Sequence, residues 1–394
     1  MSGSFPFGQP DAPTYDFVLI ERRWRRAGYL DRWAATRRPL ADIGLRPVCS
    51  LTFVGHRIAN SVAQRHDQMT KRRTFLGCVA GGLLVGPTAA FAQQSGKVYR
   101  IGILEAIPAA QNAANLDALR KGLRVLGYVE GRNLVIEYRS ADGRAERFPD
   151  LASELVRLKV DLIVTRGTPA AKAAKEATEA IPVVMATMGD PRAIVASFAR
   201  PGGNITGVTT FSTELTAKRI ELLKELNPNL SRVALLHNMS NPAAPPEWEE
   251  TKTAARALGL QVDLLDVRNQ DDLSRAFGLA IRQRVDALLI GADGLTQMHQ
   301  KTIIDMVARH RLPSAYPGRE FVEAGGLIAY AVNYPDLYFR LASFVDRIVK
   351  GAKPADLPVE QPTKFELAIN LKTAKALGLT IPRSLLLRAN EVIQ

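Results

Sequence analysis

Short apolar runs alternate with amphipathic segments from residue 98 onward. The runs, such as V-Y-R-I-G-I-L at 98–104, are rich in β-branched residues, which is typical of strands buried in a parallel sheet. The intervening segments carry apolar residues at helical spacing, as Leu116, Leu119 and Leu123 do between about 112 and 126. This alternation predicts an α/β fold with parallel strands and right-handed crossovers.

The strand–helix pattern occurs twice along the chain. A turn cluster at 201–204 and an extended run over 205–211 separate the two occurrences. We therefore predict two Rossmann-like lobes, an N-terminal one over 93–212 and a C-terminal one over 213–335. The pattern does not assign the later elements to a lobe. We expect about 336–352 to join the first lobe and about 353–394 the second.

Residues 69–92 have the three-part pattern of a secretory signal peptide. Basic residues fill 71–73, an apolar run covers 75–85, and A-F-A at 90–92 is a cleavage site before Gln93. The apolar run is too short for a membrane-spanning helix of about 20 residues. The paired arginines resemble a twin-arginine signal, with the general secretory route as the alternative. We expect cleavage near Ala92 and a periplasmic protein.

The 68 residues before Met69 differ in composition from the rest of the chain. They contain ten Arg and no Lys, and their apolar runs keep neither a strand nor a helix period. One hypothesis is that translation starts at Met69 and that 1–68 is an unused extension, disordered if it is made. The alternative is a genuine basic N-terminal domain.

Charge and cysteine content narrow the classes of function. The formal net charge of +13 would suggest a nucleic-acid partner, but residues 1–68 and the leader together carry +7 of it. The remaining +6 is spread without a basic block, so no nucleic-acid partner is expected. Both cysteines, Cys49 and Cys78, precede the cleavage site. The mature chain therefore has no disulfide, thiolate metal site or cysteine nucleophile.

No catalytic constellation is present in residues 93–394. His237, His299 and His310 have no partner at metal-ligand spacing, and each is more simply a surface or core residue. No G-x-S-x-G elbow, phosphate-binding loop or G-x-G-x-x-G fingerprint occurs. The sequence predicts a protein that is not an enzyme and that has no cofactor and no metal.

Polar and small residues follow several predicted strands. Ligands of open α/β sheets bind at the carboxyl ends of the strands, beside helix N-termini. Thr168 and Asp190 are candidates for this role, although each is equally explained as a helix cap. The candidate ligand-binding residues are Glu105, Thr168, Pro169, Ala170, Gly189, Asp190, Asn238, Asp293, Arg319 and Glu320.

Several motifs resemble one family over nearly all of residues 97–394. They include V-D-L-I-V-T-R-G-T-P-A-A at 160–171, A-R-P-G-G-N-I-T-G at 199–207 and P-T-K-F-E-L-A-I-N-L-K-T-A-K-A-L-G-L at 362–379. The chain resembles the ABC transporter substrate-binding family related to the tryptophan-binding protein TrpX. This resemblance implies a type I periplasmic binding fold, with a hinge of three crossovers between the lobes. Asp293-Gly294-Leu295 and Tyr316-Pro317-Gly318 depart from the usual wording, so the resemblance does not fix the ligand.

The resemblance implies a monomeric periplasmic protein that captures a small solute, such as an amino acid or an aromatic or carboxylate compound. The lobes would close around the ligand, and an ABC transporter permease would be the partner. Thr168 would then bind an anionic end of the ligand, Asp190 and Asp293 a cationic or hydroxyl group, and Arg319 a second polar group. Two alternatives stay open: a ligand sensor for a membrane receptor, and a periplasmic enzyme on the same fold.

Overall fold

The computed structural model describes residues 97–189, 191–210 and 212–394. The expected extension at 1–68, the expected leader at 69–92 and the candidate residue Asp190 all lie outside this part of the chain. Across the described ranges, no helix combines the length and the apolar character needed to cross a membrane.

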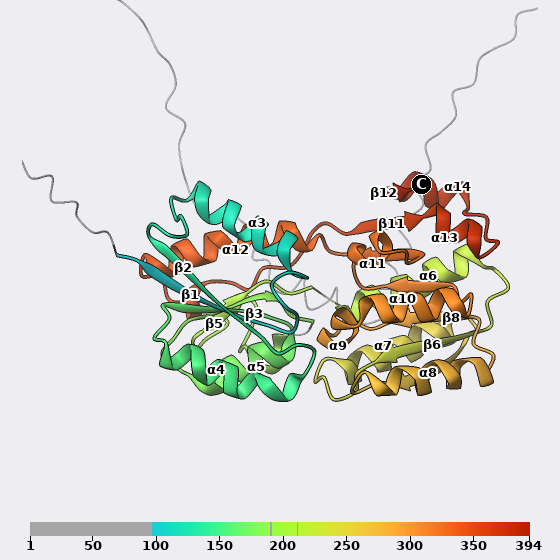
Figure 1. The fold of residues 1–394 in the computed structure, drawn as a ribbon, viewed down its shortest axis with the longest axis horizontal. Helices are drawn as coiled ribbons and strands as arrows, with labels where there is room; N and C mark the ends of the chain where they lie inside the picture. Colours follow the sequence, from blue (N-terminus) through green and yellow to red (C-terminus); the bar gives the residue numbers. More distant parts are fainter. Residues whose placement is uncertain (1–96, 190, 211) are drawn as a thin grey trace, which may run out of the picture. The chain divides into compact units, whose positions relative to one another are not determined.

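Five parallel strands form the first sheet (Figure 1). They are β1 (Tyr99–Glu105), β2 (Leu134–Ser140), β3 (Leu162–Arg166), β4 (Val183–Thr187) and β5 (Ile205–Gly207), in the order β2-β1-β3-β4-β5. One face carries α3 (Ala113–Val125) and α12 (Tyr334–Val349), and the other carries α4 (Phe148–Arg157) and α5 (Thr168–Ala177). Both faces of the inner strands β3 and β4 are covered, which is why their sequences are mostly apolar rather than alternating.

Seven strands form the second sheet, in the order β12-β11-β10-β9-β8-β6-β7. They are β6 (Arg232–His237), β7 (Gln261–Asp266), β8 (Ala287–Ile290), β9 (Ser314–Tyr316), β10 (Ile328–Ala331), β11 (Glu366–Asn370) and β12 (Glu391–Ile393). The helices of this lobe are α6 (Ser212–Leu226), α7 (Ala244–Ala257), α8 (Asp271–Arg282), α9 (Gly294–Met298), α10 (Gln300–Arg309), α11 (Arg319–Glu323), α13 (Leu371–Ala376) and α14 (Arg383–Arg388). Two apolar clusters, one on each face of the sheet, form its core.

The predicted fold class is confirmed, with one departure from purely parallel pairing. β11 runs antiparallel to β10, and β12, which the sequence pattern did not predict, pairs parallel to β11. The reason lies in the path of the chain. After β10 the chain crosses to the first sheet, forms α12 there, and re-enters the second lobe at the edge it left. A strand that starts at this edge must run away from it, opposite to β10.

Three crossovers connect the two lobes, near 208–210, 332–333 and 361–365. We expected the chain from about 353 onward to belong to the second lobe. Instead, Leu357 and Val359 pack in the cores of the first lobe, and Glu360 bridges Val208 beside β5. The connection to the first lobe thus continues to Glu360, because the edge strand β5 offers these residues backbone hydrogen-bond partners.

Candidate functional site

A cavity of about 80 Å³ lies where the carboxyl ends of the two sheets face each other. Both lobes line it, and Tyr334 lines it from the start of α12 after the second crossover. Its lining also includes Arg166, Thr168, Thr187, Asn238, Asn241, Asp293 and Leu295. Its position agrees with the rule for ligand sites in open α/β sheets.

The first wall is the turn from β3 into α5. Gly167 has φ +81° and donates its N–H to Thr187 O at 2.7 Å, which sets the sharp turn. Thr168 and Pro169 then begin the helix, and Pro suits the first turn because its missing N–H is not needed there. Thr168 is 6% exposed, and its hydroxyl has no hydrogen-bond partner among the described residues. A buried hydroxyl of this kind lacks a partner that a bound ligand would supply.

Arg166 brings a positive charge to the same wall. It is 7% exposed, donates to Asn112 Oδ1 at 3.2 Å, and lies over the Tyr334 ring. Burial acts to lower the pKa of Arg166, but neighbouring Tyr338 and Glu105 outweigh this effect and the pKa rises. The guanidinium is therefore a permanent cation next to the free N–H groups at the start of α5, and together they favour an anion.

Glu105 lies behind this wall rather than in it. Its side chain is fully buried, and Oε1 accepts hydrogen bonds from Asn112 Nδ2 at 2.9 Å and from Tyr338 OH. Burial raises the pKa of Glu105, while Arg166 opposes the rise. Glu105 therefore orients Asn112 and, through Asn112, the guanidinium of Arg166.

The second wall is built around Asp293, the N-cap of α9. Its Oδ1 accepts from Leu295 N at 2.8 Å and from Asn238 Nδ2 at 3.3 Å, and its Oδ2 accepts from Asn241 Nδ2 at 2.7 Å. Thr296 completes a capping box with the same residue. The carboxylate thus fixes both asparagine side chains at the cavity while it faces the cavity itself. Much of its hydrogen-bonding capacity is already used within the lobe.

A second cavity of about 440 Å³ adjoins the first and shares Arg166, Gln297 and Tyr334 with it. Arg319 and Glu320 line this second cavity. Arg319 lies 2.7 Å from Glu323 and 2.5 Å from Glu391, and Glu320 accepts from Gln297 at 3.2 Å. The charge of Arg319 is therefore balanced within its own lobe.

The sequence-predicted residues separate into groups. Those that line the first cavity are Thr168, Pro169, Gly189, Asn238 and Asp293. Arg319 and Glu320 line the second, Ala170 is buried in the first lobe's core, and Asp190 is not described. Arg166, Thr187, Thr210, Asn241 and Tyr334 also line the first cavity but were not selected. Arg166 and Asn241 occur in the strand-end segments T-R-G-T-P and H-N-M-S-N-P, which is the signal that could have found them.

The cavity offers charged and hydrogen-bonding groups to a ligand. Over the described ranges, no group of three or more His, Cys, Asp or Glu side chains could hold a metal ion. Among the described residues, the lining of the cavity includes one buried cation, one carboxylate and several uncharged hydrogen-bonding groups.

The family model described as "ABC transporter substrate binding protein" matches residues 100–393. The chain is 26% identical over 271 residues to a tyrosine-binding protein of Clostridioides difficile, covering 67% of this chain and 78% of that one. A solved domain from Streptococcus pneumoniae in complex with L-Trp is 28% identical, with a TM-score of 0.69, covering 75% of this chain and all of that chain. A conserved domain protein from Vibrio cholerae is 26% identical over the same shares, with a TM-score of 0.71. The chain belongs to the ABC transporter substrate-binding protein family.

Proposed function

We propose that this protein captures a free amino acid between its lobes and delivers it to the permease of an ABC importer. One observation carries the proposal. The buried Thr168 hydroxyl, which has no partner among the described residues, lies at the start of α5 beside the Arg166 cation, and Asp293 lines the same cavity from the other lobe. Opposite charges on the two walls match the carboxylate and the ammonium group of an amino acid.

The anionic end of the ligand binds at the first wall. Arg166, the Thr168 hydroxyl and the free N–H groups of α5 supply donors there. The ammonium group faces Asp293, whose Oδ2 accepts a hydrogen bond from the Asn241 amide at 2.7 Å. Because the two walls belong to different lobes, the ligand bridges them only when the lobes are closed, and its binding favours closure.

The ligand side chain is apolar or aromatic. Phe148, Leu295 and Pro317 add apolar surface to the first cavity. Tyr334 faces both cavities, so a large side chain can extend past it into the space of about 440 Å³. The relatives that are named for tyrosine or were solved with L-Trp support this ligand class. We propose that the protein acts as a monomer in the periplasm after loss of the leader.

Thermal shift with matched ligands tests the proposal. The panel contains the L-amino acids, and for each aromatic one its amine without the carboxylate and its acid without the ammonium group. A ligand at about 100 times its dissociation constant stabilises by about 2.7 kcal/mol. We expect an L-amino acid to give a shift of this size and both analogues to give much less.

A matched pair of variants tests where the ligand binds. Thr168→Val removes the hydroxyl at the cavity, and Thr178→Val removes one at the other end of α5, where it accepts from Ala180 N at 3.1 Å. We expect about tenfold weaker binding in Thr168→Val only. A wild-type protein that responds to no amino acid, or a shift that survives Thr168→Val unchanged, contradicts the proposal.

A further inference from the structure

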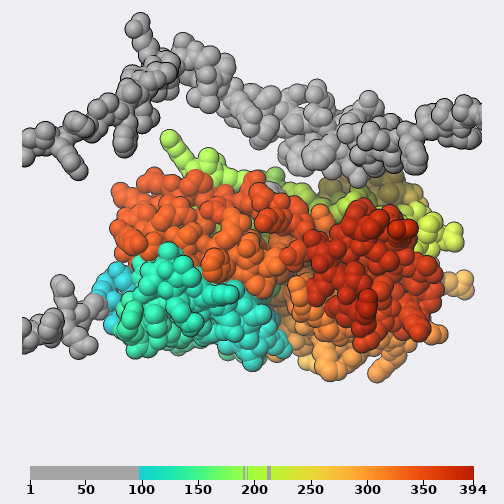
Figure 2. Space-filling view, turned by 90° about the horizontal axis from the view of Figure 1, so that it is seen from above, coloured from blue at the N-terminus to red at the C-terminus, as the bar shows by residue number. Residues whose placement is uncertain are grey.

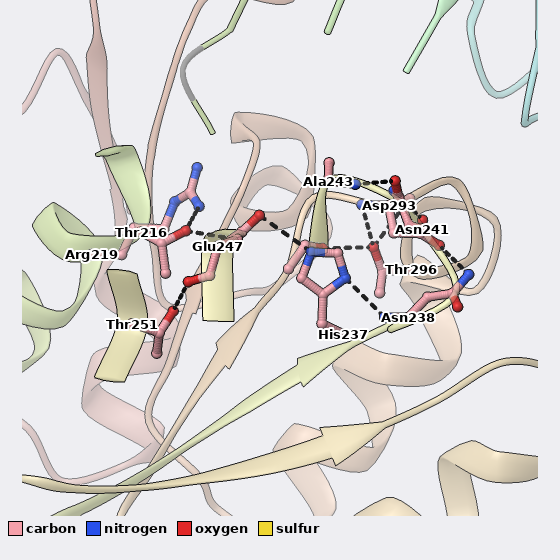
Figure 3. Close-up of polar contacts among 11 residues, drawn as sticks. Thr216, Arg219, His237, Asn238, Asn241, Ala243, Glu247, Thr251, Asp293 and Thr296 are labelled. Atoms are coloured by element: carbon pink, nitrogen blue, oxygen red, sulfur yellow. Dashed lines mark hydrogen bonds and ion pairs between the residues drawn. The ribbon is translucent and has the colours of Figure 1, made fainter. Parts of the chain in front are cut away.

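A chain of buried polar side chains leads from the ligand cavity into the second lobe (Figure 3). Asn238, which lines the cavity, donates its backbone N–H to His237 Nδ1 at 2.8 Å. His237 Nε2 lies 3.2 Å from Glu247 Oε2 on α7. The other carboxylate oxygen accepts from Thr216 on α6 at 2.6 Å, and Thr216 accepts from Arg219 at 3.1 Å. We call His237, Glu247, Thr216 and Arg219 the buried relay.

The geometry fixes where the protons and charges of the relay lie. A backbone N–H only donates, so His237 Nδ1 must be the acceptor and carries no proton. The ring proton is therefore on Nε2 and points at Glu247, whose two oxygens accept from His237 and Thr216. Glu247 is the anion, Arg219 is the cation, and His237 is a neutral connector between this pair and the cavity.

The far end of the relay reaches the second crossover. Arg219 Nε donates to the carbonyl of Tyr330 at 3.0 Å, in β10, the strand that precedes the crossover into α12. Tyr334, at the other end of this crossover, lines the ligand cavity. The relay thus connects Asn238 in the cavity with the backbone that precedes Tyr334.

Close packing holds the imidazole of His237 in one place. A Cβ added to Gly291 would lie 2.3 Å from His237 Cδ2, so only glycine at this position leaves room for the ring. Gly291 follows β8, and its carbonyl accepts from Thr296 Oγ1 at 2.9 Å, within the capping box of Asp293. The ring is therefore held between the relay and the turn that carries the second wall of the cavity.

Stability alone does not explain a fully buried ion pair. Desolvation of two charges is costly, and replacement of such a pair by apolar residues is often neutral or stabilising. Arg219 and Glu247 are both less than 3% exposed, yet they interact mainly through the intervening hydroxyl of Thr216. This arrangement indicates that the pair links the position of Asn238 in the cavity to that of the Tyr330 backbone, rather than only stabilising the fold.

We propose that His237 and Glu247 are positioning residues of the ligand site, which transmit the orientation of Asn238 in the cavity to the crossover strand β10 through Thr216 and Arg219. The inference rests on the proposed function in that it names residues that act on the same cavity. Closure around a ligand then moves the relay and the crossover together, since Arg219 ties α6 to the crossover backbone.

Two isosteric variants next to Glu247 separate the relay from ordinary packing. Thr216→Val removes the hydroxyl that joins Arg219 to the Glu247 carboxylate. Thr251→Val removes an equally buried hydroxyl that donates to the Glu247 backbone carbonyl at 2.6 Å and is not in the relay. Thr216→Ser keeps the hydroxyl and serves as the rescue variant. The measurement is amide hydrogen exchange on the full chain without ligand.

We expect Thr216→Val to speed exchange several-fold at two separated places, the loop 238–241 and the crossover 331–333. Thr251→Val should change only α7, and Thr216→Ser should return both places to wild-type rates. His237→Gln, whose amide NH2 can donate toward Glu247 from the position of Nε2 but which has no acceptor at the position of Nδ1, should affect the loop 238–241 alone. If Thr216→Val and Thr251→Val give the same exchange at 238–241, the inference is overturned.

Calorimetry with L-tryptophan and L-tyrosine as probes gives the second arm. Thr216→Val should weaken the better probe about tenfold and Thr251→Val by less than about twofold. If wild-type protein binds neither probe while the exchange pattern is as expected, the relay stands and the ligand class proposed above falls. If wild-type protein binds and neither exchange nor affinity separates the two valine variants, the relay falls and the proposed function stands.

Discussion

The guanidinium of Arg166 lies 4.7 Å from the centre of the Tyr334 ring. Arg166 ends β3 in the first sheet, whereas Tyr334 follows the crossover that leaves β10 in the second. Both residues line both cavities. A cation over an aromatic face contributes about 0.5 to 2 kcal/mol, more when water is excluded. The contact therefore holds the charged wall of the site against the chain that connects the lobes. In the space-filling view, the orange residues of α12 lie against the turquoise residues of α3 (Figure 2).

Substitution of Tyr334 tests this contact. Tyr334→Leu removes the ring face, so the Arg166 guanidinium loses its support and the protein should bind its amino acid about fivefold more weakly, on the order of 1 kcal/mol. Tyr334→Phe keeps the face and should bind within about twofold of wild type. Isothermal titration calorimetry measures both. Equal affinities in the Leu and Phe variants would show that the ring face has no role.

The raised pKa of Glu105 predicts that the free energy of unfolding falls as the pH rises toward neutral. Burial raises its pKa above the ordinary 4.5, so the folded state holds a proton that the unfolded state has released. The wild-type free energy of unfolding should therefore fall as pH rises from about 4.5 through the raised pKa. Glu105→Gln keeps an acceptor for Asn112 and Tyr338 without titrating, so its stability relative to wild type should rise with pH.

Urea unfolding at several pH values checks this expectation, with the exposed Glu146→Gln as control. A Glu105→Gln difference that stays constant or shrinks with rising pH would refute the account of this carboxyl.

The lowered pKa of Glu247 predicts the opposite pH dependence of stability, which should fall as the solution becomes acidic. Burial acts to raise this pKa, but the hydrogen bond from His237 and the positive charge of Arg219 outweigh burial, and the pKa lies below the ordinary 4.5. The stability it contributes is present above about pH 4.5 and is lost as pH falls through the lowered pKa. Glu247→Gln should therefore be less stable than wild type at neutral pH, and the difference should narrow in acid. A gap that widens below pH 4.5, measured by the same urea unfolding, would contradict the charge assignment in the relay.

How far the sequence predicts the fold depends on the length of each element. The amphipathic α3 was predicted because many of its residues repeat the helical period, and the buried strands β3 and β4 because each is a short, mostly apolar run. α9 and α11 span a single turn or slightly more, and β12 has only three residues, all half-buried. Segments this short show no period. The direction of β11 depends on where the chain re-enters the second lobe, which is a tertiary property.

The same limit applies to the site. The rule that ligands bind at strand ends selected Thr168, Asn238 and Asp293, all of which line the cavity. It could not select Tyr334, whose place depends on a crossover between sheets. It also could not separate Glu105 from the cavity residues, because a strand end does not reveal that Asn112 and Tyr338 cover the carboxylate.

Two helical glycines give a matched prediction about packing. A Cβ on Gly122 in α3 would lie 2.6 Å from Phe339 O and 2.8 Å from Ala342 Cβ of α12, so Gly122→Ala should force the helices apart and cost about 1 to 3 kcal/mol. A Cβ on Gly278 in α8 meets nothing closer than Arg282 Nη1 at 3.5 Å, so Gly278→Ala should stabilise by about 0.5 to 1 kcal/mol.

Chemical denaturation of the two alanine variants decides this point. If Gly122→Ala is as stable as wild type, α3 and α12 do not pack as closely as described, and the cover of the first sheet near Tyr334 needs revision.

The central claim is that one small amino acid binds between the lobes at Thr168 and Arg166. Native mass spectrometry of protein purified without denaturation, after incubation with the L-amino acid panel, tests it most directly. The account predicts one adduct of amino-acid mass per wild-type chain, retained in Thr178→Val and lost in Thr168→Val combined with Arg166→Gln. A wild-type chain that carries no adduct, or an adduct that persists in the double variant, would contradict it.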